Sequence, residues 1–399
     1  MSARSAPWRV YGLLVAGTLV YTSLMFSWFS LPAYLPTIIE DVGLSETQAG
    51  ILAGAVPLTY IPLALFSGLA VDRIGPGRSL LLALVCIGCS QLARSVAPGF
   101  VGLLGTTIAL GVGATLITFG LPKLVSVLFP PESTGVPSSV YLVGASAGTA
   151  AAFSVGRPLV GPALGGWREL FFWTGVVILC YAVVWLAVVW FSRLGTQQQP
   201  TSEELPMVDD LKTVLVHPQL RLVVVLGITY LLIIHGLQGW LPTILESRGL
   251  SAGRAGQTTT LLVGANVVGV LTIPGLADRL DARRGAIVGA SAVAGLGVVG
   301  IIGGGATALA VAGIVGAGLG VGGLSPMVRA IPPALEGIGP RLTGTAVGLV
   351  FAVGEIGGFA GPFLIGLLRD STGSFVPGLA VLAASGLAAV LAGARLDTA

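Results

Sequence analysis

The sequence is poor in charge. Only 9% of its 399 residues are Asp, Glu, Lys or Arg, whereas an ordinary soluble domain carries about 25%. Apolar residues make up 54%, which is more than a water-facing fold of this size can bury. The shortage of charge therefore excludes an ordinary soluble enzyme, a secreted disulfide scaffold and a disordered regulator. It predicts a chain whose main solvent is lipid.

Metal ligands and basic runs are scarce too. Two histidines and three scattered cysteines are too few for a structural metal site. Cys86 and Cys89 form a C-x-x-C inside an apolar run, which indicates packing on one helix face and no disulfide. The net charge is +3 and no basic stripe exists, so a nucleic-acid partner is not expected. We expect no bound metal.

Catalytic signatures are also missing. The run Gly318–Gly323 satisfies G-x-G-x-x-G, but no strand precedes it and it lies inside an apolar segment, so it is not a dinucleotide fingerprint. No G-x-x-x-x-G-K-[ST] loop is present, which leaves ATP-driven pumping unsupported. No hydrolase or phosphoryl-transfer constellation stands out. The sequence predicts a protein that is not an enzyme and needs no cofactor.

Long apolar segments run nearly from end to end. Each can cross a bilayer core, which needs about 20 helical residues, and no segment alternates as a barrel strand would. Pro32, Pro57, Pro62 and Pro122 predict kinks in the longer segments. The sequence therefore predicts an all-α integral membrane protein with twelve transmembrane helices, over 10–37, 46–71, 79–97, 99–128, 134–164, 169–192, 220–245, 253–277, 285–304, 307–333, 341–368 and 375–394.

The distribution of basic residues predicts the orientation. Fourteen Lys and Arg fall on the side of the two termini and five, Arg94 among them, on the opposite side. The positive-inside rule then places both termini in the cytoplasm. The first apolar segment is much longer than the core of a signal peptide and no cleavage site stands out. We expect a multi-pass protein of the cytoplasmic membrane that keeps its first segment as an anchor.

An internal repeat divides the chain. Residues 34–50 and 240–256 agree at ten of seventeen positions with a constant offset of 206, and Asp72-Arg73 maps onto Asp278-Arg279 at the same offset. A second match at offset 200 carries Gly161-Pro162 onto Gly361-Pro362. The halves are parallel copies of one six-helix unit. We predict an N-terminal bundle at 1–192, a cytoplasmic linker at 193–219 and a C-terminal bundle at 220–399.

The loop after the second segment carries a known signature. Gly68, Asp72, Arg73, Gly75 and Arg78 closely resemble the pattern that the major facilitator superfamily carries between its second and third helices. The second half holds a degenerate copy with Asp278, Arg279, Arg283 and Arg284. The run from Gly156 to Arg168 resembles the motif of the fifth helix in this family. The resemblance covers the whole chain and implies two pseudo-symmetric six-helix bundles that open alternately to each side.

The resemblance also assigns roles to the motif residues. Gly68, Asp72, Arg73, Arg78, Asp278 and Arg279 would form a cytoplasmic latch, since Asp72 at a helix end can accept bonds from a helix N-terminus or from arginines. The alternative is a set of loop charges that only fixes topology. Small and helix-bending residues, Gly161, Pro162, Gly361 and Pro362, would serve close packing and hinging.

Charges within the spans are costly and usually functional. Arg157 in the fifth span is a candidate cation for an anionic substrate group. Glu355 and His235 lie in spans that are neighbours in this family, so they are a candidate proton-responsive pair. The alternative for each of the three is a structural pair buried between helices. Lys123 and Arg329, related by the offset of 206, are candidate cavity cations or snorkelling residues near the cytoplasmic end.

Uncharged side chains complete the candidate substrate site. Tyr34, Gln238, Trp240 and Asn266 are candidates for the cavity wall, with packing or an interfacial belt as the alternative. Short segments such as Leu-Pro-Lys123 look most like those of the cyanate and nitroimidazole transporter branch of the family. This resemblance implies a small organic or inorganic anion as substrate. We therefore predict a monomeric secondary active transporter, with protons as candidate coupling ions. The alternative is a proton-coupled exporter of hydrophobic drug-like compounds, with Glu355 as the coupling carboxylate.

Overall fold

The computed structural model describes residues 7–130, 133–192, 213–214, 216–305, 307–335 and 338–397. Twelve of its helices are long and apolar enough to cross a membrane, which confirms the predicted all-α membrane fold. Most of the predicted linker, residues 193–212 and 215, lies outside the described residues. The division of the chain at 193–219 therefore stays a prediction.

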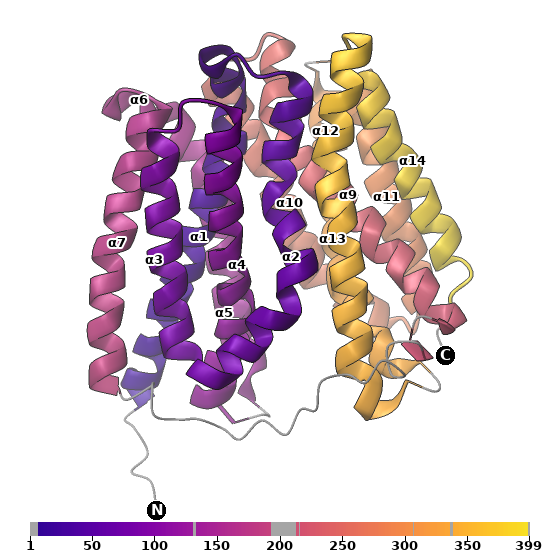
Figure 1. The fold of residues 1–399 in the computed structure, drawn as a ribbon. Coiled ribbons are helices and arrows are strands. Elements are labelled where there is room, and N and C mark those ends of the chain that lie inside the picture. Colours follow the sequence, from indigo (N-terminus) through magenta and orange to yellow (C-terminus); the bar gives the residue numbers. More distant parts are fainter. Residues whose placement is uncertain are drawn as a thin grey trace, which may run out of the picture. The chain divides into compact units, whose positions relative to one another are not determined.

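The helices of the first half follow one another with short connections (Figure 1). Pro32 and Pro36 lie inside the first helix, and Pro122 lies inside the fourth. The fifth span is not regular, because it changes to a π-helix that contains Pro158, whose missing N–H disturbs the ordinary hydrogen-bond ladder. The elements are α1 (Pro7–Val42), α2 (Glu46–Ile74), α3 (Pro76–Ser95), α4 (Phe100–Leu128), α5 (Gly135–Ala151), η2 (Ala152–Val160), α6 (Gly161–Leu164) and α7 (Trp167–Ser192).

The second half begins with the long helix α9. Its N-terminus is capped by His217, whose Nδ1 accepts from the amide of Leu220, and it has Pro218 in its first turn. The α10 helix has a serine cap, Ser251. The elements are α9 (Pro218–Ser247), α10 (Ala252–Arg279), α11 (Arg283–Gly303), α12 (Ala308–Ala330), the 3₁₀ turn η3 (Pro332–Ala334), α13 (Gly339–Thr372) and α14 (Val376–Gly393).

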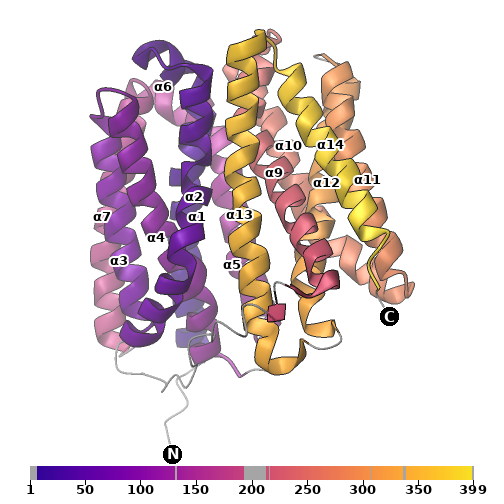
Figure 2. The same ribbon diagram turned by 45° about the vertical axis from the view of Figure 1, so that its right-hand side comes forward.

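The chain forms two compact units that do not follow the repeat boundary. Unit 1 comprises Met1–Leu31 and Pro62–Ser202, and unit 2 comprises Pro32–Ile61 and Glu203–Ala399. The first two helices thus divide between the units beside Pro32 and Pro62, two of the positions where the sequence predicts kinks. Within unit 1, α3 packs against α4 and α7; within unit 2, α9 packs against α13, and α12 against α10 and α11 (Figure 2).

Small residues set the packing inside unit 2. A Cβ atom on Gly50 of α2 would lie 2.6 Å from the carbonyl oxygen of Pro362 on α13, and one on Gly54 would lie 2.8 Å from that of Phe359. The two backbones can approach this closely only because these residues have no side chain. Gly361 itself packs against α9, where a Cβ would lie 3.1 Å from the amide nitrogen of Gly236. This close approach to α9 is the geometry behind the packing role predicted for Gly361, which stays a prediction.

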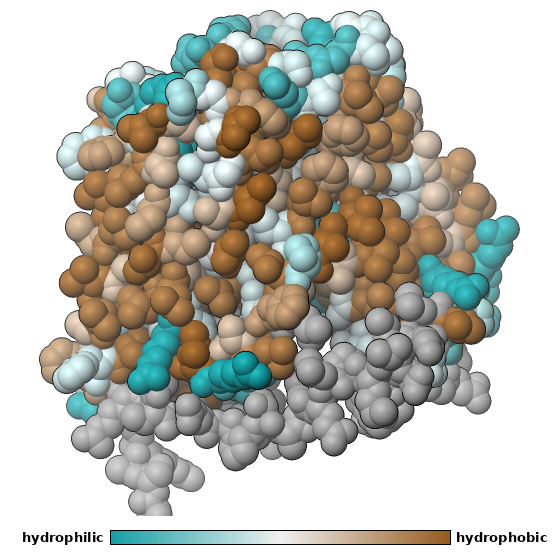
Figure 3. Space-filling view, viewed as in Figure 1, coloured by the Kyte–Doolittle hydropathy of each residue, from teal (hydrophilic) through white to brown (hydrophobic). Residues whose placement is uncertain are grey.

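Apolar side chains cover the sides of the helices, and hydrophilic ones gather toward the helix ends on the visible face (Figure 3). Large apolar residues such as Phe66, Val183 and Trp190 are more than half exposed. In water such a surface would drive aggregation. In a bilayer it is the surface that the acyl chains require. The distribution therefore agrees with a multi-pass membrane protein.

Candidate functional site

Polar side chains meet in unit 2, where α9 packs against α12 and α13. Tyr230 on α9 is buried, with 4% of its surface exposed. It is a polar residue directly before the apolar run Leu231 to Ile234. The side chains of Ser325 and Arg329 on α12 lie close enough to its hydroxyl to interact with it. A buried tyrosine usually finds a partner for its O–H group. Here the neighbouring groups include the cation that the sequence predicts as functional.

Arg329 lies over an aromatic ring. Its guanidinium carbon lies 4.7 Å from the centre of the Phe351 ring on α13. Glu355, one helical turn further along α13, is near enough to interact electrostatically with Arg329, but among the described residues no carboxylate forms an ion pair with this arginine. A guanidinium stacked on a ring keeps its N–H edge available for a planar anion.

Glu355 and His235 approach each other at a glycine. A Cβ atom on Gly358 would lie 2.7 Å from Oε2 of Glu355 and 3.2 Å from Cδ2 of His235, with Pro57 of α2 on a third side. Oε2 of Glu355 is buried and has no hydrogen-bond partner among the described residues. The two candidate proton-responsive residues therefore lie beside the same glycine. A carboxylate in such surroundings is costly to keep charged.

The sequence identified part of this cluster. His235, Arg329 and Glu355 were predicted as functional, whereas Tyr230, Ser325 and Phe351 were not. A signal for the missed residues exists, since Ser325 precedes Arg329 by four positions and Phe351 precedes Glu355 by four. Residues four apart share a helix face. A polar or aromatic residue one turn from an intramembrane charge is therefore a reasonable candidate partner. We call Tyr230, His235, Ser325, Arg329, Phe351 and Glu355 the α9–α12–α13 cluster.

The first copy of the signature motif makes an ion pair in unit 1. Nζ of Lys123 on α4 lies 2.9 Å from Oδ1 of Asp72 at the end of α2, and both side chains are 22% exposed. Asp72 thus has a lysine from the neighbouring helix as its partner, rather than arginines or a helix N-terminus. Lys123, predicted as a cavity cation, is engaged by the predicted latch carboxylate.

Gly75 and Gly68 of this motif differ in whether their position requires a glycine. Gly75 has φ = +82° just before α3, a conformation that favours glycine. Gly68 meets no atom within 4 Å of an added Cβ, so the described contacts do not require a glycine there. Arg73 and Arg78 are exposed.

The second copy of the motif pairs differently. Nε of Arg283 at the start of α11 lies 2.9 Å from Oδ1 of Asp278, and both side chains are more than half exposed. Arg279 is exposed. Asp278 therefore has a local partner across the α10–α11 turn, and the two copies of the motif use their aspartates in different ways.

Arg157 lies on η2 in unit 1 and is 7% exposed. The helix around it packs against α1, because the Phe153 and Phe29 rings lie 5.9 Å apart and a Cβ on Gly156 would lie 3.2 Å from the Phe26 ring. Gly161 begins α6, and its carbonyl accepts the amides of Gly165 and Gly166, which close the helix. The roles predicted for Arg157, Gly161 and Pro162 remain predictions.

The uncharged candidates of unit 2 have mixed surroundings. Trp240 is fully buried, donates from Nε1 to the carbonyl of Pro362 at 2.8 Å and lies against Phe375. These contacts fit the packing alternative. Tyr34 is 5% exposed. Gln238 and Asn266 are half-buried, and the α10 backbone at Asn266 is in close contact with α12.

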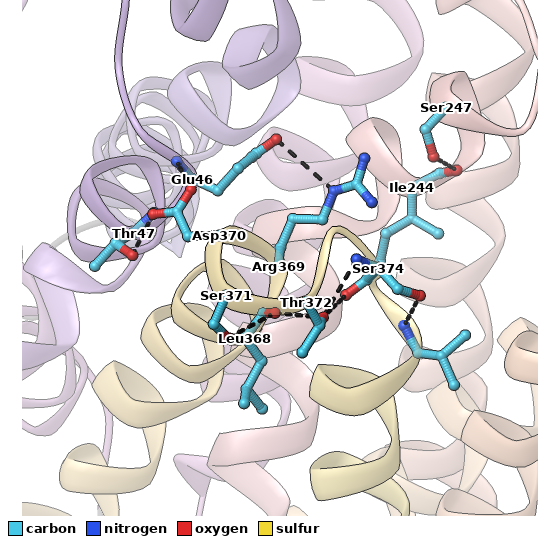
Figure 4. A network of polar contacts seen from close by, with 11 residues as sticks. Glu46, Thr47, Ile244, Ser247, Leu368, Arg369, Asp370, Ser371, Thr372 and Ser374 are labelled. Atoms are coloured by element: carbon cyan, nitrogen blue, oxygen red, sulfur yellow. Dashed lines mark hydrogen bonds and ion pairs between the residues drawn. The ribbon is translucent and has the colours of Figure 1, made fainter.

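The N-terminal end of α2 is tied to the C-terminal end of α13 (Figure 4). The carboxylate of Asp370 accepts the amide of Glu46 at 2.9 Å and that of Thr47 at 2.8 Å, and it also accepts from the Thr47 hydroxyl. Arg369 lies 4.0 Å from the Glu46 carboxylate. A residue of α13 thus caps the α2 helix, because its oxygens satisfy amides that have no partner within the helix.

A cavity of about 660 Å³ lies at another place in unit 2. It includes the Asp278–Arg283 pair but none of the residues of the α9–α12–α13 cluster. The rest of its wall is mostly apolar, with His217, Pro218, Gln219, Pro274, Ala277, Ile287, Pro326, Met327, Ala330, Ile331, Ala334, Leu335 and Asp397. The cluster is therefore distinct from this cavity.

Comparison with known proteins places this architecture in a family. The model of the Major Facilitator Superfamily matches residues 17–362. The chain belongs to this superfamily. It is a transporter with twelve membrane-spanning helices, and its family carries small solutes.

Two bacterial relatives from Escherichia coli strain K12 match most of the chain. A 2-nitroimidazole transporter is 29% identical over 93% of this chain and 92% of its own. A 3-(3-hydroxy-phenyl)propionate transporter is 27% identical over 89% of this chain and 85% of its own. The first of these bears out the predicted likeness to the nitroimidazole transporter branch.

A solved structure supports the fold. A bacterial homolog of the human lysosomal transporter Spinster, in an inward-facing and occupied conformation, superposes with a TM-score of 0.79. The alignment covers 98% of this chain and 96% of the other, at 18% identity. At this identity the likeness concerns the fold.

Proposed function

We propose that this transporter carries a small organic anion across the cytoplasmic membrane by alternating access, with the anion bound at Arg329. The observation that carries the proposal is the arrangement of Arg329 itself: its guanidinium lies over the Phe351 ring, Tyr230 lies close to it, and no carboxylate forms an ion pair with it among the described residues. Lys123, its counterpart in the repeat, is already paired with Asp72. The name of the phenylpropionate transporter, a relative, supports a carboxylate substrate.

The chemistry of the cluster suits a carboxylate. A guanidinium can bind both oxygens of a carboxylate at once, and the hydroxyls of Tyr230 and Ser325 can donate to the same group. Phe351 supplies a flat apolar surface beside the charge. An anion with an apolar or aromatic body therefore fits better than a sugar or a bare cation. Arg157 in unit 1 remains the second candidate cation of the substrate path.

Glu355 would couple this binding to protons. While the site holds no substrate, Arg329 provides the positive charge nearest to Glu355 that the structure shows. When a substrate anion binds Arg329, it neutralises that charge and adds a negative one, so Glu355 is expected to take up a proton. His235 beside Gly358 would be the exchange partner for this proton. Anion and proton would then move together, with the sequence halves 1–192 and 220–399 as the rocking domains.

A ligand screen followed by transport assays tests this proposal. Thermal stability of the purified protein in detergent would be measured with aromatic monocarboxylates, dicarboxylates, nitrate, cyanate and lipophilic cations. A carboxylate at 100 times its dissociation constant should stabilise the protein by about 2.7 kcal/mol. Uptake of the stabilising anion into proteoliposomes should then be lost in Arg329→Gln and weakened in Arg157→Gln.

Arg254→Gln is the matched control, since Arg254 is an exposed arginine of the same unit outside the cluster. It should bind and transport as the wild type does. Anion uptake that survives Arg329→Gln unchanged would contradict the assigned site. Stabilisation only by lipophilic cations, dependent on Glu355, would replace the proposal with export of hydrophobic compounds.

A further inference from the structure

The positive-inside count places Arg94 on the side opposite the termini, near the end of the third predicted span, 79–97. The structure places it on the last turn of α3 with its side chain turned inward and 0% of its surface exposed. A long side chain near a helix end can reach into the protein as well as toward water. A wholly buried cation needs an explanation.

The partners of Arg94 are all neutral. Its Nη1 donates to the carbonyl of Ser27 at 3.2 Å and to Oε1 of Gln91 at 2.9 Å, and its Nη2 donates to Oγ1 of Thr107 at 3.1 Å. Its guanidinium carbon lies 5.4 Å from the centre of the Phe171 ring. In the described part of the chain no carboxylate pairs with it. These dipoles and the ring reduce the cost of the charge but do not neutralise it.

Three more hydrogen-bonding atoms around Arg94 are buried without a partner in the structure. They are Nε of Arg94, Oγ of Ser27 and Nε2 of Gln91, and all three residues are fully buried. Each of these atoms carries a hydrogen that can be donated. The side-chain oxygen of Gln91 accepts from Arg94, and its amide nitrogen is bonded to the same carbon as that oxygen. Unmet donors of this kind are rare in native interiors, and an excess of donors around a cation calls for an anion.

We propose that Arg94, Ser27 and Gln91 form a buried binding site for a single small inorganic anion of the halide class, with chloride as the physiological occupant. The site lies inside unit 1, among α1, α3, α4 and α7, and is separate from the substrate site proposed on unit 2. The anion is a structural ligand that compensates the charge of Arg94. It is not the transported substrate.

Size and direction of bonding favour a monatomic ion. The surrounding residues are sealed, since Thr107 is 2% exposed and Phe171 is fully buried, so a large organic anion has no room for its body. A halide accepts hydrogen bonds from any direction, which suits a guanidinium and an amide of α3 together with a hydroxyl of α1. A water molecule could accept from one or two of these donors, but it would leave the positive charge without a counter-ion.

Halide dependence of stability is the first measurement. Thermal unfolding of the full chain in detergent would be followed while gluconate is replaced by chloride or bromide at constant ionic strength. The unfolding temperature should rise by several degrees along a saturable curve, because only the folded state holds the site. Crystals grown in bromide should show an anomalous scattering peak beside Arg94, Ser27 and Gln91.

Two substitutions separate an anion site from a merely structural arginine. In Ser27→Ala the lost hydroxyl has no protein partner, so stability in gluconate should stay the same while the halide concentration at half-effect rises several-fold. In Gln91→Glu a carboxylate beside Arg94 takes the place of the anion. This variant should be at least as stable as the wild type in gluconate and should lose its response to halide.

Arg168→Gln is the matched control. Arg168 also bonds to backbone carbonyls, those of Ser95 and Ala97 at the end of α3, so its loss should lower stability and keep the halide response. Equal unfolding temperatures in gluconate and chloride, with no bromide peak, would overturn the proposal and leave water as the occupant. A halide response that Ser27→Ala and Gln91→Glu leave intact would overturn it as well.

Discussion

Lys123 in unit 1 and Arg329 in unit 2 occupy equivalent positions of the repeat, and they are used differently. Lys123 is bound by Asp72 at 2.9 Å. The equivalent aspartate, Asp278, is bound by Arg283 instead, a residue whose counterpart in the first half is Gly77. One added arginine in the second copy of the motif thus supplies a partner for Asp278. Arg329, the counterpart of Lys123 in the second half, is thereby available to Phe351, Tyr230 and Glu355.

The residues around Lys123 and Arg329 also differ, because the second half is more polar at the equivalent positions. At the offsets of the repeat, the counterparts of Tyr230, His235 and Glu355 are Leu24, Phe29 and Val155. The first copy is apolar at each of these positions. A duplicated unit can therefore keep its helices and its motif while only one copy acquires a polar cluster. Unit 1 thus holds its cation in an ion pair, whereas the cation of unit 2 is the one that we propose for binding.

The largest expected effect concerns Glu355. In Glu355→Gln the side chain keeps its shape but can no longer exchange a proton, so transport driven by a pH gradient should fall to the level without a gradient. Exchange of substrate across the membrane should continue. The measurement is uptake and counterflow in proteoliposomes with and without a gradient from pH 5.5 to 7.5. Glu40→Gln, at an exposed position of α1, is the control. A mutant that still responds to the gradient would remove Glu355 from the coupling step.

The two ion pairs of the motif give the next effect. Removal of the carboxylate in Asp72→Asn should lower the free energy of unfolding by about 1 kcal/mol, because the Lys123–Asp72 pair is largely shielded from water. The same change in Asp278→Asn should cost about half as much or less, since that pair is mostly exposed. Double-mutant cycles with Lys123→Gln and Arg283→Gln would measure both coupling energies. Equal coupling energies for the two pairs would contradict the difference described here between the two copies of the motif.

Asp72→Asn also tests the latch role predicted from the motif. If the Asp72–Lys123 pair belongs to one conformational state, its loss should shift the balance between inward and outward accessibility, as measured by cysteine labelling at both sides. The order of preference among substrates should stay the same. An altered order would indicate that Lys123 takes part in binding after all.

The smallest effects concern the glycines of the motif. Gly75→Ala should destabilise by about 1 kcal/mol, because φ = +82° is unfavourable for a residue with a Cβ. Gly68→Ala should be neutral or stabilising by about 0.5 kcal/mol, since the site has open space and alanine favours the helix. Thermal unfolding of the two variants, measured side by side, tests both predictions. A large loss of stability in Gly68→Ala would mean that the position serves a close approach in another state.

The fold was largely predictable from the sequence, and the site only in part. Hydropathy depends on composition and spacing, so the twelve spans follow from it, while the family follows from the resemblance of the motif that begins at Gly68. His235, Arg329 and Glu355 were found because charge inside a span is unusual. Tyr230, Ser325 and Phe351 have ordinary residue types for a membrane helix, and their role comes from which helix faces them.

Arg94 shows another limit. The sequence places it near the end of a span, but whether its side chain turns inward or toward solvent is a property of packing. The division of α1 and α2 between two compact units is likewise absent from any local pattern. Pro32 and Pro62 mark where a helix can bend, but the contacts of Gly50 and Gly54 with α13 decide which unit the segment joins.

The cap that Asp370 places on α2 has a consequence for how this joint can open. Its carboxylate accepts the amides of Glu46 and Thr47, which are half-buried residues at the start of α2. Water that reaches these amides can accept the same hydrogen bonds. This polar cap can therefore break and re-form by exchange with solvent, while the close packing of Gly50 and Gly54 against α13 joins the same two helices independently of it.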